Sequence, residues 1–180
     1  MNRKFFFLLL ATISAFAQQP QYSFLDFLEG TWAAEPQANG GSGLCKFSRD
    51  LQGQIIVRTN HAEYPAANGR PAVVHDDLMV IYADSSKNVH ADYYDNERHV
   101  IRYDVSSVSK GLVVFISQPI SGTPRYRLTY TSVSETRVSG SFEIATPDQP
   151  EKFTSYLNWF MQRAATSIRP PFPSKPPKGQ

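Results

Sequence analysis

Residues 22–32 read Tyr-Ser-Phe-Leu-Asp-Phe-Leu-Glu-Gly-Thr-Trp, and they are the strongest indication of the fold in the chain. Four of the five residues 24–28 are apolar, which predicts a helix of one to two turns. Ser23 can cap its start, with Asp26 in the capping-box position, and Gly30 supplies the left-handed residue that ends it. We expect this helix to plug one end of a barrel, the alternative being an ordinary N-terminal helix packed on a sheet.

The residues that follow alternate between apolar and polar in short runs, which is typical of strands. The predicted strands cover about residues 30–36, 43–50, 54–63, 73–83, 88–95, 98–106, 111–118, 125–132, 136–145 and 153–162. Turn-forming residues connect them, and no helical segment between strands is long enough for parallel crossovers. We therefore predict an all-β fold, an up-and-down antiparallel barrel of about ten strands, because closure removes exposed strand edges.

The N-terminus has the pattern of a secretory signal peptide. Arg3 and Lys4 precede an apolar run over residues 5–13, and residues 15–17 read Ala-Phe-Ala. We expect cleavage near Ala17 and a secreted or periplasmic protein. The apolar run is shorter than the roughly 20 residues that a lasting membrane span needs, so we predict no membrane span.

The signal peptide over residues 1–17 is followed by the predicted barrel domain over residues 18–165. Residues 166–180 are rich in proline, and we expect an extended or disordered tail. A partner that docks on this tail is the alternative to a solvated end.

Charge and cysteine content narrow the function. The chain has 18 basic and 16 acidic residues, and cleavage would remove Arg3 and Lys4 and leave 16 of each. A formally neutral protein lacks the basic surface of a nucleic-acid binder. The single Cys45 cannot form an internal disulfide, and its alternation with Phe47 indicates a small buried residue rather than a nucleophile. The oligomeric state has no signal in the sequence.

Hairpin register predicts which side chains face inward, because cross-strand neighbours share a face. A turn centred on Ser86 places Tyr82 opposite His90, and a two-residue turn at 96–97 then places His90 opposite Tyr103. The other predicted interior residues are Leu78, Val80, Asp92, Ile101, Val105, Val114, Leu128, Phe142 and Ile144, with Tyr126 opposite Phe142. The predicted outer face carries Asp77, Arg102, Asp104, Arg125, Arg127, Arg137 and Glu143.

This predicted interior contains a polar patch. Its predicted ligand-binding members are Tyr82, His90, Asp92, Tyr94, His99 and Tyr103. Tyrosine and histidine can donate to a buried carboxylate, so the patch is either a network that fixes strand register or a set of polar anchors in an apolar cavity. The second interpretation predicts binding of a small, mostly apolar molecule. The alternatives are an acid–base enzyme that uses His90 and Asp92, and a structural or partner-binding barrel without a ligand.

A metal site is a weaker hypothesis. Three His-x-acid pairs occur, His61/Glu63, His75/Asp77 and His90/Asp92. His90 and His99 are predicted to lie about 13 Å apart on neighbouring strands, too far for metal bonds of about 2 Å, and His75 falls on the predicted outer face. We predict no metal ligands and no catalytic residues, and the chain has no hydrolase, metalloprotease or nucleotide-binding motif.

The stretch Phe24-Leu25-x-Phe27-Leu28-x-Gly30-Thr31-Trp32 resembles the start of lipocalin-like barrels of the calycin superfamily. The resemblance extends in pattern to about Arg163 and implies a barrel with a ligand pocket. In calycins a basic residue near the end of the last strand packs across this tryptophan, and Arg163 is the matching residue here. The chain most resembles exported bacterial lipocalin-like proteins that have no settled activity.

A second resemblance concerns cofactors. The Gly-x-Pro…His-x-acid passage at residues 69–77 resembles that of nitrobindin-type barrels. Those barrels hold haem through a histidine in a C-terminal strand. Residues 156–161, Tyr-Leu-Asn-Trp-Phe-Met, contain no histidine, so haem is disfavoured and no cofactor is predicted.

Overall fold

The structure is a computed structural model that describes residues 22–37, 40–67 and 69–165. The predicted signal peptide (1–17) and the predicted tail (166–180) lie outside the described residues. The strands are β1 (Gly30–Ala34), β2 (Ser42–Asp50), β3 (Ile55–Tyr64), β4 (Val73–Ala83), β5 (Val89–Asp95), β6 (Val100–Ser109), β7 (Leu112–Ser117), β8 (Arg125–Ser134), β9 (Arg137–Ala145) and β10 (Thr154–Arg163). Two short 3₁₀ helices, η1 (Ser23–Leu28) and η2 (Leu51–Gly53), flank the first strands.

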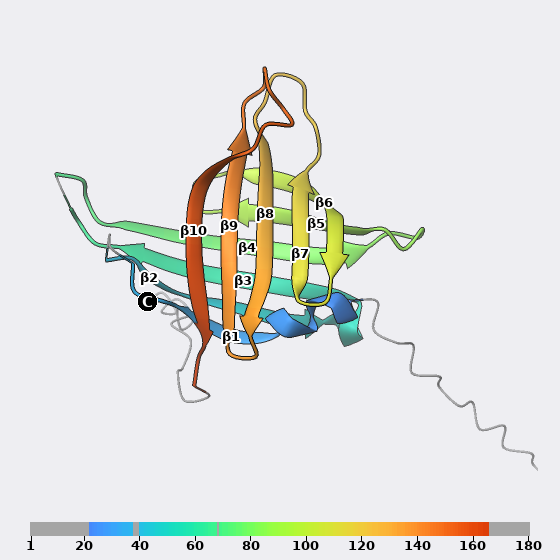
Figure 1. The fold of residues 1–180 in the computed structure, drawn as a ribbon, viewed down its shortest axis with the longest axis horizontal. Coiled ribbons are helices and arrows are strands. Elements are labelled where there is room, and N and C mark those ends of the chain that lie inside the picture. Colours follow the sequence, from blue (N-terminus) through green and yellow to red (C-terminus); the bar gives the residue numbers. More distant parts are fainter. Residues whose placement is uncertain (1–21, 38–39, 68, 166–180) are drawn as a thin grey trace, which may run out of the picture.

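The ten strands form one closed antiparallel barrel. Each strand pairs with the next one along the chain, and β1 pairs with β10 to close the sheet. In Figure 1, β8, β9 and β10 cross in front of β3 and β4 at a steep angle, as the tilted strands of a closed barrel do. The all-β, up-and-down barrel predicted from strand alternation and turn chemistry is therefore confirmed.

Side chains fill one end of the barrel. Along β7, Val113, Phe115 and Ser117 are buried and alternate with partly exposed residues, which is the period-two pattern of a strand with one buried face. The large fully buried side chains without a hydroxyl are Leu25, Leu28, Trp32, Phe47, Ile56, Met79, Ile81, Val113, Phe115 and Val138. Because the list includes both leucines of η1, the short helix packs into the barrel core, as predicted.

The predicted helix cap is wrong. Ser23 lies inside η1, whose N-cap is Tyr22, and no side chain caps the helix. The turn is 3₁₀, so the N–H of Leu25 already donates to the Tyr22 carbonyl at 2.8 Å. Asp26 instead forms an ion pair with Arg49 on β2, with an N–O distance of 2.5 Å.

Gly30 turns the chain from η1 into β1. Its φ of 117° lies in the left-handed region, as predicted for the residue that ends the helix. A Cβ atom at this position would lie 2.5 Å from Nη1 of Arg163, so the glycine also leaves room for that side chain. Two residues later Trp32 is fully buried, and it pairs in register with Arg163 of β10.

The predicted register is wrong at the β5–β6 turn, which reverses the faces of β4 and β5. Tyr94 pairs with Val100 rather than with His99. The Asp95 carboxylate accepts hydrogen bonds from the backbone N–H groups of Glu97 (2.9 Å) and His99 (2.8 Å). Arg98 adopts φ 75°, and the turn is one residue longer than predicted. A shift of one residue moves every side chain of a strand to the other face.

Candidate ligand cavity

A cavity of about 880 Å³ lies inside the barrel. It extends to Gln37, Pro65, Arg70 and Pro71 in the β1–β2 and β3–β4 loops, at the end of the barrel opposite η1. Its volume falls within the range of about 300–1,000 Å³ that is typical of small-molecule sites. The cavity has two chemically different walls.

One wall is aromatic and comes from β8, β9 and β10. Tyr126 stacks on Phe142 with ring centres 5.7 Å apart and an interplanar angle of 11°. Tyr156, close to the loops, meets Phe142 edge-on, and Tyr130 meets Trp159 edge-on, both at 6.1 Å. The other apolar lining residues of these strands are Leu128, Ile144, Leu157 and Met161. This wall offers flat aromatic surface to a ligand.

The facing wall, from β3, β4 and β5, is polar, and its centre is a buried ion pair. Arg58 on β3 donates to Asp77 on β4 and to the Tyr130 hydroxyl. Asn60 donates to the second oxygen of Asp77 at 2.9 Å. Burial raises the pKa of Asp77, but the adjacent Arg58 and the other donors outweigh burial and lower the pKa below its usual value. Asp77 is therefore a carboxylate and Arg58 a guanidinium.

His75 extends this polar wall toward the loops. Its Nε2 lies 3.2 Å from the Tyr93 hydroxyl and 3.4 Å from Asp77 Oδ2, and its Nδ1 lies 3.1 Å from Glu97 Oε1. The hydrogen bond to Asp77, assisted by Glu97 and opposed by burial, raises the pKa of His75 to about 9. At neutral pH the imidazole is protonated and acts as a donor on both sides.

Asp95 forms the end of the polar wall next to the β5–β6 turn. Its carboxylate accepts from the Tyr93 hydroxyl (3.3 Å) and lies 2.8 Å from Nδ1 of His99. Burial raises the pKa of Asp95, but the backbone and side-chain hydrogen bonds from His99 outweigh burial and lower it. Hydrogen bonds and ion pairs thus connect the charged groups of this wall in one network that runs from Tyr130 to His99.

Cys45 on β2 lines the cavity as a buried free cysteine. Burial raises the pKa of its thiol to about 12, so the group stays protonated. A neutral thiol in this position behaves as a small apolar residue, as the sequence predicts.

The structure separates the six residues predicted to bind a ligand. Tyr103 and His99 line the cavity. Tyr82, His90, Asp92 and Tyr94 lie on the outer face of β4 and β5, because the neighbouring residues along each strand face inward. The prediction that these four residues face the interior is wrong, and the longer β5–β6 turn is the reason.

His90 lies in an outer-face cluster instead. Its Nδ1 is 2.7 Å from Asp104 and its Nε2 is 3.2 Å from Asp84, and its ring lies against that of Tyr82 with centres 5.7 Å apart. The cluster ties the β4–β5 turn to β6. The His90/Asp92 pair of the enzyme hypothesis therefore does not face the cavity.

The sequence prediction missed Arg58, Asn60, His75, Tyr93 and Asp95 as cavity residues. It also placed Asp77 on the outer face, which is wrong, because Asp77 is buried beside Arg58. One signal was present in the sequence. Arg58 interrupts the apolar run Ile55-Ile56-Val57 at the position where the inward row of β3 continues, and an inward arginine requires a buried acidic partner.

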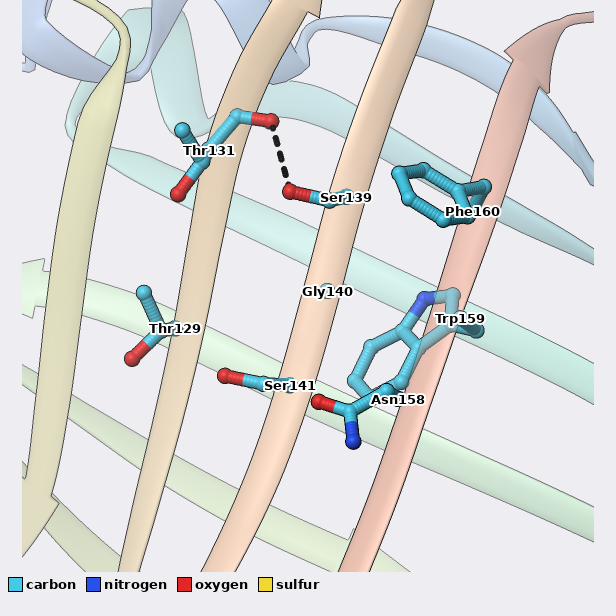
Figure 2. Close-up of a pocket in the computed structure, with 8 residues that line it drawn as sticks. All are labelled: Thr129, Thr131, Ser139, Gly140, Ser141, Asn158, Trp159 and Phe160. Atoms are coloured by element: carbon cyan, nitrogen blue, oxygen red, sulfur yellow. Dashed lines mark hydrogen bonds between the residues drawn. The ribbon is translucent and has the colours of Figure 1, made fainter. Parts of the chain in front are cut away.

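A second depression, of about 310 Å³, lies on the outer side of β8, β9 and β10 (Figure 2). Its lining is Thr129, Thr131, Ser139, Gly140, Ser141, Asn158, Trp159 and Phe160. Ser139 donates to the Thr131 carbonyl at 3.4 Å. This lining contains no charged side chain, and we assign no ligand to it.

No family model matches the chain, and no curated protein sequence matches it either. Over the part of the chain that the structure describes, no three His, Cys, Asp or Glu residues are grouped so that they could hold a metal ion. Within the same residues, no helix combines the length and apolar character needed to span a membrane.

Proposed function

We propose that this chain is a lipocalin-like protein that binds a small, mostly apolar molecule inside its barrel. The observation that carries the proposal is the cavity of about 880 Å³ with an aromatic wall opposite a polar wall. A ten-stranded barrel without a cavity would need large side chains at the inward positions that line this space. Instead, small residues such as Gly43 and Ala62 occupy two of them.

We also propose that the protein acts outside the cytoplasm. The support is the signal-peptide pattern of residues 3–17. N-terminal sequencing of the protein purified from its own host should give a chain that starts close to Gln18. A mature protein that retains Met1 would contradict this proposal.

A fluorescent probe tests cavity binding directly. The neutral dye N-phenylnaphthylamine should bind saturably, with a large rise in its emission. Ala62→Trp places an indole in the cavity, because Ala62 lines it from β3, and should abolish binding. The matched control is Thr59→Trp, which lies on the same strand but pairs with Leu78 on the outer face and should bind the dye normally.

The binding proposal fails if dye binding does not saturate, or if Ala62→Trp and Thr59→Trp reduce dye binding equally. Native mass spectrometry of protein from its host then identifies any retained molecule by its mass. The expected result is an added mass that Ala62→Trp eliminates and Thr59→Trp retains.

The acid–base alternative has weaker support. The His/Asp pair that faces the cavity is His75 with Asp77, not His90 with Asp92. With its pKa near 9, His75 holds its proton at neutral pH, and both ring nitrogens already face acceptors. A general base needs a free nitrogen lone pair at working pH. This arrangement favours a polar anchor over a base.

A further inference from the structure

The charged groups of the cavity wall are already paired with one another. Arg58 pairs with Asp77, and His75 lies between Asp77 and Glu97. The Asp95 carboxylate accepts from the backbone N–H groups of Glu97 and His99 and lies 2.8 Å from Nδ1 of His99. A charged ligand would have to displace one of these partners and leave the other buried without compensation, which is costly.

Arg70 also borders the cavity, but it lies in the exposed β3–β4 loop. An exposed guanidinium interacts weakly with an anion, because water screens the charge. Glu97 of the same rim carries the opposite sign. The rim therefore does not select for either charge.

Neutral donors remain available. Among the described residues, no hydrogen-bond partner reaches the hydroxyl of Tyr103, the hydroxyl of Tyr126 or the indole N–H of Trp159, and all three side chains line the cavity. Two of the three, Tyr126 and Trp159, belong to the aromatic wall.

Tyr103 is the most deeply buried of these three donors. Only 1% of its surface is exposed, and its ring packs edge-on against Phe115 with centres 6.4 Å apart. Its hydroxyl nevertheless keeps contact with the open space of the cavity. Burial raises the pKa of this hydroxyl, so it remains a proton donor. Because no protein acceptor occupies this hydroxyl, a ligand oxygen in the cavity can accept its hydrogen bond.

We infer that the cavity takes an uncharged, ring-bearing molecule with an acceptor oxygen, and that the Tyr103 hydroxyl donates a hydrogen bond to this oxygen while the rings of the ligand lie against Tyr126, Phe142 and Trp159. This inference rests on the proposed function, since it names the ligand class of the same cavity.

Three probes that share one ring system separate the contribution of the rings from the contributions of the acceptor oxygen and of a negative charge. Fluorenone has planar rings and a carbonyl acceptor, fluorene has the rings without the acceptor, and fluorenone carboxylate adds a negative charge. Isothermal titration should show that fluorenone binds about five- to tenfold more tightly than fluorene, as one neutral hydrogen bond provides. The carboxylate should bind more weakly than fluorenone.

Tyr103→Phe removes the hydroxyl and keeps the ring that packs on Phe115. It should bind fluorenone and fluorene with equal affinity. The matched control is Tyr82→Phe on the outer face, which should keep the wild-type preference. Infrared spectroscopy gives an independent measurement, because the carbonyl stretch of bound fluorenone should lie at lower frequency in the wild type than in Tyr103→Phe.

Three results would overturn the inference while leaving the binding proposal intact, provided that N-phenylnaphthylamine still binds. These are equal binding of fluorene and fluorenone to the wild type, tighter binding of the carboxylate, and no binding of any fluorene probe. If the dye fails to bind as well, the proposed function itself fails.

Discussion

The guanidinium carbon of Arg163 lies 4.4 Å from the centre of the Trp32 ring, across the seam where β10 meets β1. The indole is fully buried and donates to the Leu28 carbonyl at 2.7 Å, while Arg163 donates to the Glu29 carbonyl at 2.8 Å. One residue pair thus links the last strand, the first strand and the end of η1. This is the contact that the calycin resemblance implies.

Trp32→Ala should therefore destabilise the barrel by about 3–5 kcal/mol, because it leaves a cavity in the closed end. Arg163→Ala should cost about 1 kcal/mol, since the arginine is exposed and a cation–π contact at an exposed site is weaker. Urea unfolding of the two single variants and the double variant measures their coupling. Strictly additive losses would show that the stacked contact contributes no stability of its own.

The Arg58–Asp77 pair should be much more sensitive to substitution than an outer pair. Asp77→Asn leaves a buried guanidinium without its counter-charge, and we expect a loss of about 3–5 kcal/mol in the free energy of unfolding. Glu143→Gln is the matched control, because Glu143 pairs with Arg127 through two hydrogen bonds of 2.6 and 2.7 Å on the outer face. That change should cost about 1 kcal/mol or less. Similar losses for the two variants would contradict a special role for the buried pair.

The sequence predicts the barrel well because its signals are local. Turn residues and period-two alternation locate all ten strands to within a few residues. The β8–β9 pairing differs from the prediction by two residues, since Tyr126 pairs with Ile144 rather than with Phe142. The side chains of both strands nevertheless point to the predicted faces. An even shift preserves the inward side chains.

The cavity is harder to predict, because an odd shift reverses a face. Hydrogen bonds to the Asp95 carboxylate stabilise a β5–β6 turn that is one residue longer than predicted. As a result Tyr93, rather than Asp92, faces the inside of the barrel. The network from Tyr130 to His99 joins residues on four strands, β8, β3, β4 and β5. No local pattern specifies that these side chains meet, so the polar wall emerges only once the barrel is closed.

The raised pKa of His75 predicts a pH dependence of stability. The folded value of about 9 exceeds the ordinary value of 6.5. The protonated form is therefore favoured by folding, and its contribution is complete below pH 6.5 and is lost as the pH rises through 9. We expect a loss on the order of 1–2 kcal/mol over this interval, because solvent screens a side chain that is 25% exposed.

NMR titration of the imidazole checks the His75 prediction without unfolding, with His75→Gln to assign the resonance. The variant should also show a shallower decline of melting temperature between pH 6.5 and 9. A His75 resonance that titrates near 6.5 would contradict the hydrogen-bonding arrangement on the polar wall.

Gly140 is the position where one methyl group should disturb the cavity wall most directly. A Cβ atom there would lie 2.2 Å from two atoms of the Trp159 ring, which lies against the glycine in the neighbouring strand (Figure 2). The backbone of Gly140 does not have a positive φ, so Gly140→Ala should act through ring displacement rather than backbone strain. We expect destabilisation of about 1–3 kcal/mol and a changed tryptophan emission spectrum. Ser141→Ala, one residue away and on the outer face, should change neither quantity measurably. If Gly140→Ala matches the wild type in both, the indole does not occupy this position against β9, and the aromatic wall must be revised.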